Sequence, residues 1–291
     1  MNASELTFGI EFETTMPAGS VTVGGYSSGA AVAWLPEGWK AKGDGSIRAG
    51  RGRVGCEFVS PVLKGADGVR QVLEVLTALK ARGASVNDST GLHIHVGGFD
   101  MSEQNIARLT TLVANFESAI YATTGTDARE RSRWCQSVAR HGSFDAAFRG
   151  NGNGYGGPVV QSRYHVLNLT NLGRADKRTV EFRAFSGTLN PVKVCGYIHL
   201  CLGLVERALK AKRKTNWAAK AVKESSPIHR SGEGQTALTR LFYQLGWIKG
   251  RTQFCYGDVT AAGAPTHKSM KRQMMKLAKQ YDAKKLARSG Q

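Results

Sequence analysis

Alternation of apolar and polar residues predicts five strands in the first two thirds of the chain. In each run, successive side chains would point to opposite faces of a sheet, so every second residue is apolar. The runs also favour residues common in strands and end near Gly, Pro, Asn or Ser. They cover residues 7–15, 53–60, 92–96, 164–169 and 179–185.

A helical repeat of apolar residues predicts three helices between and after these strands. Residues 69–80 place five apolar side chains on one face. Ser102 is a suitable N-cap for a second helix. Asn190 followed by Pro191 joins an N-cap to a residue favoured in the first turn, and the helical spacing continues to basic residues at 210–214.

The remaining segments differ in composition. Residues 123–161 are rich in Gly, Asn, Arg and Ser and are too long for an ordinary connection, so we expect a lid or substrate loop there. The last eighty residues are polar with helical propensity. The sequence therefore predicts a main domain at 1–210 and a basic, mostly helical C-terminal extension at 211–291, separable from the main domain.

Polar residues interrupt four of the predicted strands in the same way. In the first strand Phe8, Ile10 and Phe12 share one face, and Glu11 and Glu13 share the other. The other three strands carry polar residues among apolar ones in the same manner. These residues are Glu57, then His93 and His95, and then Glu181 with Arg183.

If these strands form one sheet, four carboxylates and two imidazoles converge on one face. Two like charges about 4 Å apart repel by about 4 kcal/mol at an effective dielectric of 20, so the cluster needs protons or a cation. Oxygen ligands with one or two imidazoles suit Mg²⁺ or Mn²⁺ better than zinc. Glu11 and Glu13 would lie about 7 Å apart, which allows two neighbouring ions.

The charge balance indicates anionic partners. The 291 residues are 41% hydrophobic and 21% charged, which is globular composition, but the formal net charge is +18. Residues 265–291 hold eight basic residues and one acid, a net charge of +7. We expect either polyanion contact through this tail or a solvated helix, and arginines of the main domain facing substrate phosphates.

Other sequence features narrow the class of protein. The five cysteines form an odd set without a C-x-x-C pair, which favours reduced thiols. The sequence has no stretch resembling a membrane span or a signal peptide, so we expect a cytoplasmic protein without membrane contact. Residues 25–29 fit G-x-S-x-G without a following helix, and residues 152–157 fit G-x-G-x-x-G without a preceding strand, so both are interpreted as loops.

Taken in order, the motifs resemble those of the amidoligase family, ATP-dependent carboxylate-amine ligases related to glutamine synthetase and glutamate-cysteine ligase. The resemblance covers about residues 6–210, and residues 211–291 match no family. The motifs lie at residues 9–13 (GIEFE), 43–46 (GDGS), 57–61 (EFVSP), 91–96 (GLHIHV), 132–135 (SRWC), 179–183 (TVEFR) and 187–190 (GTLN).

The resemblance implies an α+β fold, a glutamine synthetase-like catalytic fold with a curved, mainly antiparallel sheet backed by helices. It also implies ATP and two or more Mg²⁺ or Mn²⁺ ions. By similarity, Glu13 and Glu57 would bind the ion nearer the acceptor carboxylate. Glu11, His93 and Glu181 would bind the ion at the ATP phosphates, and His95 would be an extra ligand or support one.

Other roles also follow from the resemblance alone. Arg183 and Arg163 would face the transferred phosphoryl group and act with Glu57 in catalysis. The residues that it assigns to ATP binding are Arg163, Arg183, Arg133, Asp44 and Ser46.

The expected function is therefore amide formation between a carboxylate and an amine through an acyl phosphate. Such phosphoryl transfer relies on positioning and on cations, which the residue set supplies. The substrates stay open: an amino acid, a peptide, a protein side chain or a modified base. Two alternatives remain, a basic nucleic-acid-binding protein with a degenerate ligase-like site and a metal-dependent amide hydrolase. The intact acidic set argues against degeneracy.

Overall fold

The predicted strands form one antiparallel sheet in the computed structural model of the chain, which describes residues 1–138, 163–211, 234–248 and 262–290. Within these residues the sheet has eight strands in the order β2-β3-β4-β1-β6-β8-β7, and β5 also pairs with β1. The central strands are β4 (Arg53–Val59), β1 (Thr7–Pro17), β6 (Gly91–Gly97) and β8 (Val180–Ser186). The short strands are β2 (Ala30–Ala31), β3 (Lys40–Gly43), β5 (Leu63–Lys64) and β7 (Leu167–Asn168).

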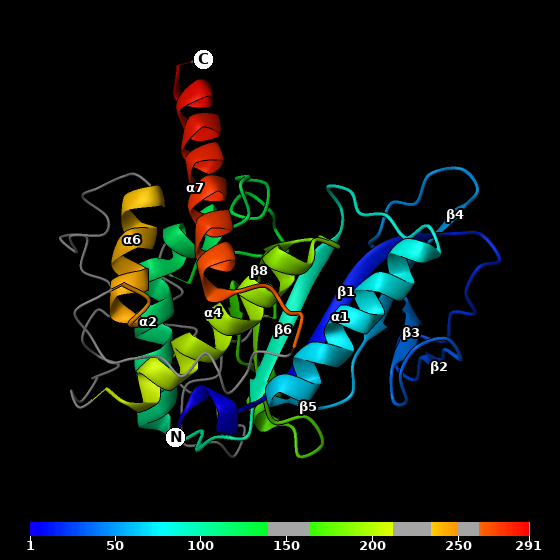
Figure 1. Cartoon of the computed structure of the whole chain (residues 1–291), viewed down its shortest axis with the longest axis horizontal. Coiled ribbons are helices and arrows are strands. Elements are labelled where there is room, and N and C mark those ends of the chain that lie inside the picture. Colours follow the sequence, from blue (N-terminus) through cyan, green and yellow to red (C-terminus); the bar gives the residue numbers. More distant parts are fainter. Residues whose placement is uncertain (139–162, 212–233, 249–261, 291) are drawn as a thin grey trace.

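Helices cover the apolar face of this sheet (Figure 1). Helices α1 (Gly65–Ala81) and α4 (Pro191–Leu209) contact the sheet directly, and α2 (Glu103–Ala122), α6 (Gly234–Gln244) and α7 (His267–Ser289) pack together with α4 beside it. Two short 3-10 helices, η1 (Ala3–Glu5) and η2 (Thr170–Gly173), complete the described elements. The α+β class that the sequence predicts, with an antiparallel sheet backed by helices, is confirmed.

The core lies between the sheet and the helices. Phe8, Ile10 and Phe12 of β1 are at most 2% exposed, and Leu92 and Ile94 of β6 are fully buried. These side chains are the apolar half of each alternating pattern, and their burial accounts for the strand positions because it removes apolar surface from water. The opposite face of the sheet therefore carries the polar half.

Most predicted elements are confirmed with small changes of boundary. Asn190 caps α4, since its side chain accepts hydrogen bonds from the backbone N–H groups of Val192 and Lys193. Ser102 occupies the N-cap position of α2 but makes no side-chain cap hydrogen bond. The strand predicted at 164–169 is reduced to the two residues of β7.

A β-bulge changes which face of the sheet the side chains of β8 point to. The pairing between β6 and β8 shifts between Leu92 and Ile94, so that two residues of β8 oppose His93. Arg183 therefore stays on the polar face with Glu181, while Phe185 turns into the core and stacks on Tyr197 of α4 with ring centroids 4.3 Å apart. Strict alternation would have placed Phe185 on the polar face.

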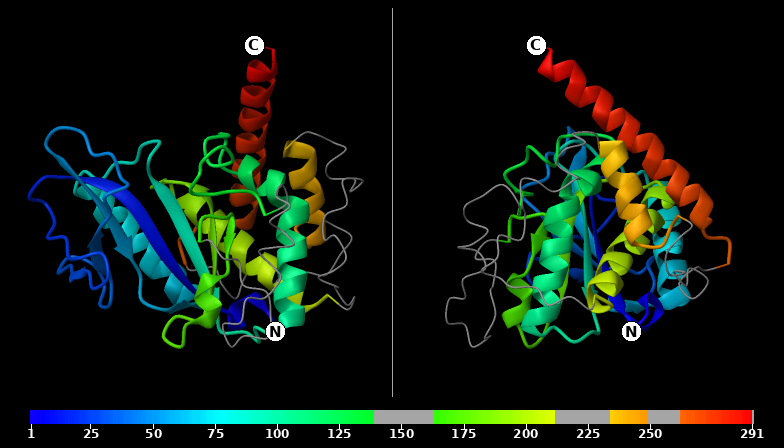
Figure 2. Two further views of the ribbon diagram at one scale, coloured as in Figure 1. Left: turned by 180° about the vertical axis from the view of Figure 1, so that it is seen from behind. Right: turned by 90° about the vertical axis from the view of Figure 1, so that its left-hand side faces the viewer.

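Helix α7 differs from the expectation of a separable tail. Its buried residues lie at helical spacing and pack against α2, α4 and α6. Only its C-terminal end projects from the rest of the molecule (Figure 2). The buried residues of α7 are Met270, Met274, Leu277, Ala278 and Tyr281.

Some predictions fall on residues outside the described part. The predicted lid at 123–161 is described only to residue 138, and residues 152–157 lie outside the described ranges. The domain boundary at residue 210 stays a prediction. Among the helices described, none has the length and apolar character needed to cross a membrane.

Candidate active site

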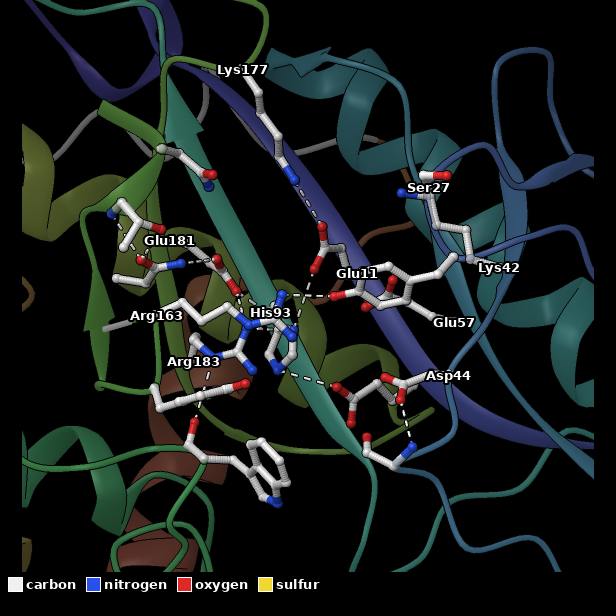
Figure 3. A pocket seen from close by; sticks show the side chains of 18 of the residues that line it. Glu11, Ser27, Lys42, Asp44, Glu57, His93, Arg163, Lys177, Glu181 and Arg183 are labelled. Carbon is white, nitrogen blue, oxygen red and sulfur yellow. Dashed lines mark hydrogen bonds and ion pairs between the residues drawn. The ribbon is translucent and has the colours of Figure 1, made fainter. Parts of the chain in front are cut away.

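Cross-strand pairing brings the predicted polar residues together on the open face of the sheet. Because β1 lies between β4 and β6, and β6 between β1 and β8, each polar residue lies opposite another in the next strand. The pairs are Glu13 with Glu57, Glu11 with His93, and His95 with Glu181. Figure 3 shows Glu11, Glu57, His93 and Glu181 in front of the sheet.

Glu11 is at the centre of this arrangement. Its Oε1 lies 2.9 Å from Nε2 of His95 and accepts a hydrogen bond of 3.0 Å from Nζ of Lys177. Its Oε2 lies 3.3 Å from Nδ1 of His93. Burial alone would raise the pKa of the Glu11 carboxyl, but His95, His93 and Lys177 outweigh it and hold that pKa well below its usual value.

Arg183 and Glu181 form a buried ion pair beside this group. Nη1 of Arg183 donates to Oε1 of Glu181 at 2.5 Å and lies 3.5 Å from Nδ1 of His93. The side-chain amide of Asn168 donates to the other oxygen of Glu181 at 2.6 Å. Burial opposes the charged form of Glu181, but His95 and Arg183 prevail and lower its pKa.

Glu57 has the opposite electrostatics. Burial raises the pKa of its carboxyl well above the usual value, and the nearby carboxylates of Glu11, Glu13 and Asp44 raise it further. Lys42 offsets only part of this effect. The pKa values of Glu11 and Glu57 are therefore shifted in opposite directions on one face of the sheet.

The polar face borders a cavity of about 530 Å³. Nearly all of the predicted site residues line it. His95 lies beside the cavity, buried against Glu11, and Arg133 lies outside the lining with its guanidinium over the ring of Trp134, which does line the cavity. The predicted residues that line it are Glu11, Glu13, Asp44, Ser46, Glu57, His93, Arg163, Glu181 and Arg183.

Three groups of carboxylate and imidazole atoms on this face are close enough to share metal ions. Within each group, the possible ligand atoms lie within 4.8 Å of one another. The grouping differs from the expected ligand sets because His95 joins Glu11 and Glu181, and Asp44 joins Glu13. The groups are Glu11, His95 and Glu181; Glu11, Glu57 and His93; and Glu13, Asp44 and Glu57.

Two buried nitrogen atoms indicate whether the carboxylates and histidines of this face fit a cation. In the described part of the chain, Nε2 of His93 and Nε2 of His95 are buried and have no hydrogen-bond partner. Each lies beside a carboxylate, Nε2 of His95 at 2.9 Å from Oε1 of Glu11 and Nε2 of His93 at 3.4 Å from Oε1 of Glu13. His95 and His93 belong to two different groups of possible ligands, so each of these two groups joins an imidazole to carboxylates, and this donor set fits divalent ions.

Gly91, the first residue of β6, leaves room in the cluster. Its backbone N–H donates to Oε2 of Glu13 at 2.5 Å. A Cβ atom at Gly91 would lie 3.0 Å from Nε2 of His93 and 3.1 Å from both Nη1 of Arg129 and Oε2 of Glu13. A side chain at this position would therefore crowd three polar groups of the site.

Several residues of the cavity were not predicted. Lys42 lies two residues before Asp44, where alternation along β3 could have indicated it. Arg129 and Lys177 lie in connections whose sequences give no periodic signal. Tyr26 lies in the turn interpreted as a loop, and its hydroxyl accepts a hydrogen bond of 2.7 Å from Nη1 of Arg163.

Comparison with known proteins agrees with the resemblance seen in the motifs. A family model described as "Putative amidoligase enzyme" matches residues 35–143. The resemblance to amidoligases is therefore confirmed for this part of the chain. No curated protein sequence matches the chain.

Among solved structures, the chain is similar to a bifunctional glutathione synthetase from Pasteurella multocida, with 9% sequence identity, a TM-score of 0.45, and coverage of 97% of this chain and 52% of that one. It is also similar to a chain from the complex between the prokaryotic ubiquitin-like protein Pup and its ligase PafA, with 10% identity, a TM-score of 0.43, and coverage of 96% and 64%. The chain thus spans about half of the first protein and less than two thirds of the second.

Proposed function

We propose that this protein is an ATP-dependent ligase that forms an amide bond between a carboxylate and an amine through an acyl-phosphate intermediate. The match of residues 35–143 to the amidoligase family supports the reaction class. One observation carries the proposal. A cluster of carboxylates that could bind metal ions and several arginines, buried and exposed, line the same cavity. Phosphoryl transfer requires both, because charge moves between phosphate oxygens in the transition state.

Mg²⁺ or Mn²⁺ would be held by the three groups of the cluster, with at least two ions in the ATP-bound state. Oxygen-rich ligation with imidazole is the set that these ions accept. When bound, the ions neutralise phosphate charge and supply Lewis acidity. Glu57 and Glu13 with Asp44 would face the acceptor side, while Glu11, His95 and Glu181 would face the nucleotide.

The arginines act on the transferred group. Arg183 is held by Glu181, which fixes its guanidinium in the lining of the cavity and keeps it charged. Arg163 lines the same cavity, and its guanidinium donates a hydrogen bond to the Tyr26 hydroxyl. Fixed guanidinium groups can stabilise charge that develops on the γ-phosphoryl oxygens without reorganising during the reaction.

The proposed reaction has two steps, transfer of a phosphoryl group and then transfer of an acyl group. An oxygen of the acceptor carboxylate forms a bond to the γ-phosphorus of ATP, and the bond between the γ-phosphorus and the bridging oxygen breaks to give ADP. The amine nitrogen then attacks the carbonyl carbon, loses a proton, and displaces phosphate. That phosphate keeps one oxygen of the original carboxylate.

Two tests follow. Pairs of carboxylates and amines from amino acids, peptides, proteins and modified bases are screened for release of ADP with Mg²⁺. With an active pair, ¹⁸O in the carboxylate should appear in the released phosphate. Glu11→Gln should abolish ADP release, while Glu37→Gln, at an exposed surface position, should not.

Three outcomes would contradict the proposal. Release of AMP would indicate an acyl adenylate, and phosphate without label would exclude the acyl phosphate. Cleavage of an amide with the metal ion but without ATP would instead favour the hydrolase alternative.

A further inference from the structure

The C-terminal half of α7 contacts the connection that follows α2. Residues 123–132, here named the Arg129 loop, run from the end of α2 along one face of α7. The α7 residues that contact this loop are spaced to form one face of the helix. They are Leu277, Tyr281, Lys284, Lys285 and Arg288.

Two acids of the Arg129 loop hold the polar part of this contact. Asp127 is 3% exposed and forms an ion pair with Arg288. The carboxylate of Glu130 accepts hydrogen bonds from the Tyr281 hydroxyl at 2.6 Å and from Nζ of Lys285 at 3.0 Å. Both carboxylates are largely removed from water, so these bonds are stronger than exposed ion pairs.

The backbone of the loop also follows the helix closely. Gly125 has a φ of +74°, which favours glycine, and a Cβ there would lie 2.7 Å from Cδ2 of Leu277. The Gly125 carbonyl accepts a hydrogen bond of 3.1 Å from Nζ of Lys284. Only a glycine allows the loop to approach α7 at this point.

Arg129 lies between the two anchored acids and points the other way, into the cavity. It is 7% exposed and lines the cavity. Its Nη2 donates to the backbone carbonyl of Arg183 at 2.7 Å, and its buried Nε has no hydrogen-bond partner within the described residues. Asp127, two residues before this arginine, and Glu130, directly after it, are thus both held by α7.

We propose that α7 is a positioning element of the candidate active site, which acts by holding Arg129 in the cavity through Asp127 and Glu130. The helix itself contributes no group to the cavity lining. The expected effect on turnover rests on the proposed ligase function, whereas the expected effect on the loop does not.

The first experiment measures hydrogen exchange in the ligand-free protein of residues 1–291. Replacing Arg288 and Lys285 together by Ala should accelerate exchange of backbone amides at 123–132 by about tenfold or more. Peptides from β1 and β6 should exchange as in the unchanged protein, which shows that the body remains folded. The matched control replaces Lys276 and Lys279 by Ala, two exposed lysines of the same helix.

The second experiment uses a double-mutant cycle on turnover. The α7 variant and Arg129→Ala should each lower kcat, by about 10- to 100-fold, as expected for a misplaced charge in the site. If α7 acts through Arg129, combining them should lower kcat no further than Arg129→Ala alone. Arg288→Lys should retain most of the activity, and the control pair should retain all of it.

The outcomes separate this inference from the proposed function. Unchanged exchange at 123–132 in the α7 variant, or losses in kcat that multiply, would overturn the role of α7. Absence of ATP turnover in the unchanged protein with every substrate pair would instead contradict the ligase proposal, and the exchange measurement would still decide whether α7 holds the loop.

Discussion

The carboxylates of the site differ in electrostatic environment although they share one face of one sheet. Glu11 and Glu181 lie beside histidines and cationic side chains, which lower their pKa values despite burial. Glu57 lies among other carboxylates, and burial together with this repulsion raises its pKa. Much of the electrostatic repulsion in the metal-free site therefore acts on Glu57. Replacing this one residue tests that conclusion directly.

We predict that Glu57→Gln stabilises the metal-free protein. A carboxyl whose pKa is higher in the folded state than its usual value of 4.5 costs stability as pH rises from that value through the folded pKa. The substitution should remove this loss and raise Tm at neutral pH by a few degrees. Thermal unfolding in a chelator between about pH 4.5 and pH 8 measures it.

The control for this prediction is Glu37→Gln, at an exposed position. It should leave both Tm and its pH dependence unchanged. The prediction is wrong if Glu57→Gln lowers Tm at neutral pH or keeps the fall in stability with rising pH.

Arg183 provides a kinetic test at the same scale. Arg183→Lys should lower kcat by about 10²-fold with little change in the KM for ATP, because the fixed guanidinium counts most in the transition state. Arg183→Ala is less informative, since it also removes the ion-pair partner of the buried Glu181 carboxylate, at a cost of about 3–5 kcal/mol. Steady-state kinetics with the identified substrate pair measures the effect.

Arg48→Lys is the matched control, because Arg48 pairs with Asp88 on the surface. Its kinetics should equal those of the unchanged protein. A rise in KM with kcat unchanged in Arg183→Lys would assign Arg183 to ground-state ATP binding instead.

At the scale of elements, alternation was sufficient for the strands that form the site. It placed Glu11 and Glu13 opposite the apolar half of β1, and pairing with β4 and β6 then set their neighbours. The bulge in β8 could not be predicted, because it depends on the partner strand and not on the local pattern. Arg129 could not be predicted either, because its loop has no repeating pattern that would indicate where each side chain points.

Helix α7 was underestimated for a related reason. Its buried residues are two methionines, one leucine, one alanine and one tyrosine within a strongly basic segment, so the apolar pattern was weak. Tertiary packing, and not local propensity, decides where such a helix lies.

Strand β6 provides a test at the element scale. Gly91→Ala should weaken Mn²⁺ binding by about tenfold or more, because the new methyl group would crowd His93, Glu13 and Arg129. Isothermal titration with Mn²⁺ measures the affinity. Gly9→Ala in β1 is the control, since its Cβ would make only ordinary contacts, at 3.6 Å from Ser60 and 3.7 Å from His95. Equal Mn²⁺ affinities for both variants would contradict the prediction.

At the scale of the whole molecule, the +18 charge contrasts with an acidic cluster inside the cavity. Divalent ions should therefore stabilise the folded protein by binding to a site that the unfolded chain lacks. Mn²⁺ at about 100 times its dissociation constant should add about 2.7 kcal/mol to the free energy of unfolding.

The measurement compares Tm in Mn²⁺ and in a chelator. The gain should disappear in a Glu11→Gln, Glu181→Gln double variant. An equal gain in that variant would place the bound ions elsewhere. Polyanion contact through the exposed lysines of α7 stays a separate prediction, for which binding should weaken with salt.

The division of β1 into an apolar and an acidic face has a consequence for how the protein tolerates variation. In a library with every substitution along the strand, cellular abundance and activity should separate with a period of two residues. Variants at Phe8, Ile10 and Phe12 should be depleted in abundance because the core loses packing. Variants at Glu11 and Glu13 should accumulate normally yet be inactive. Residues required for folding and residues required only for activity would then alternate along a single strand.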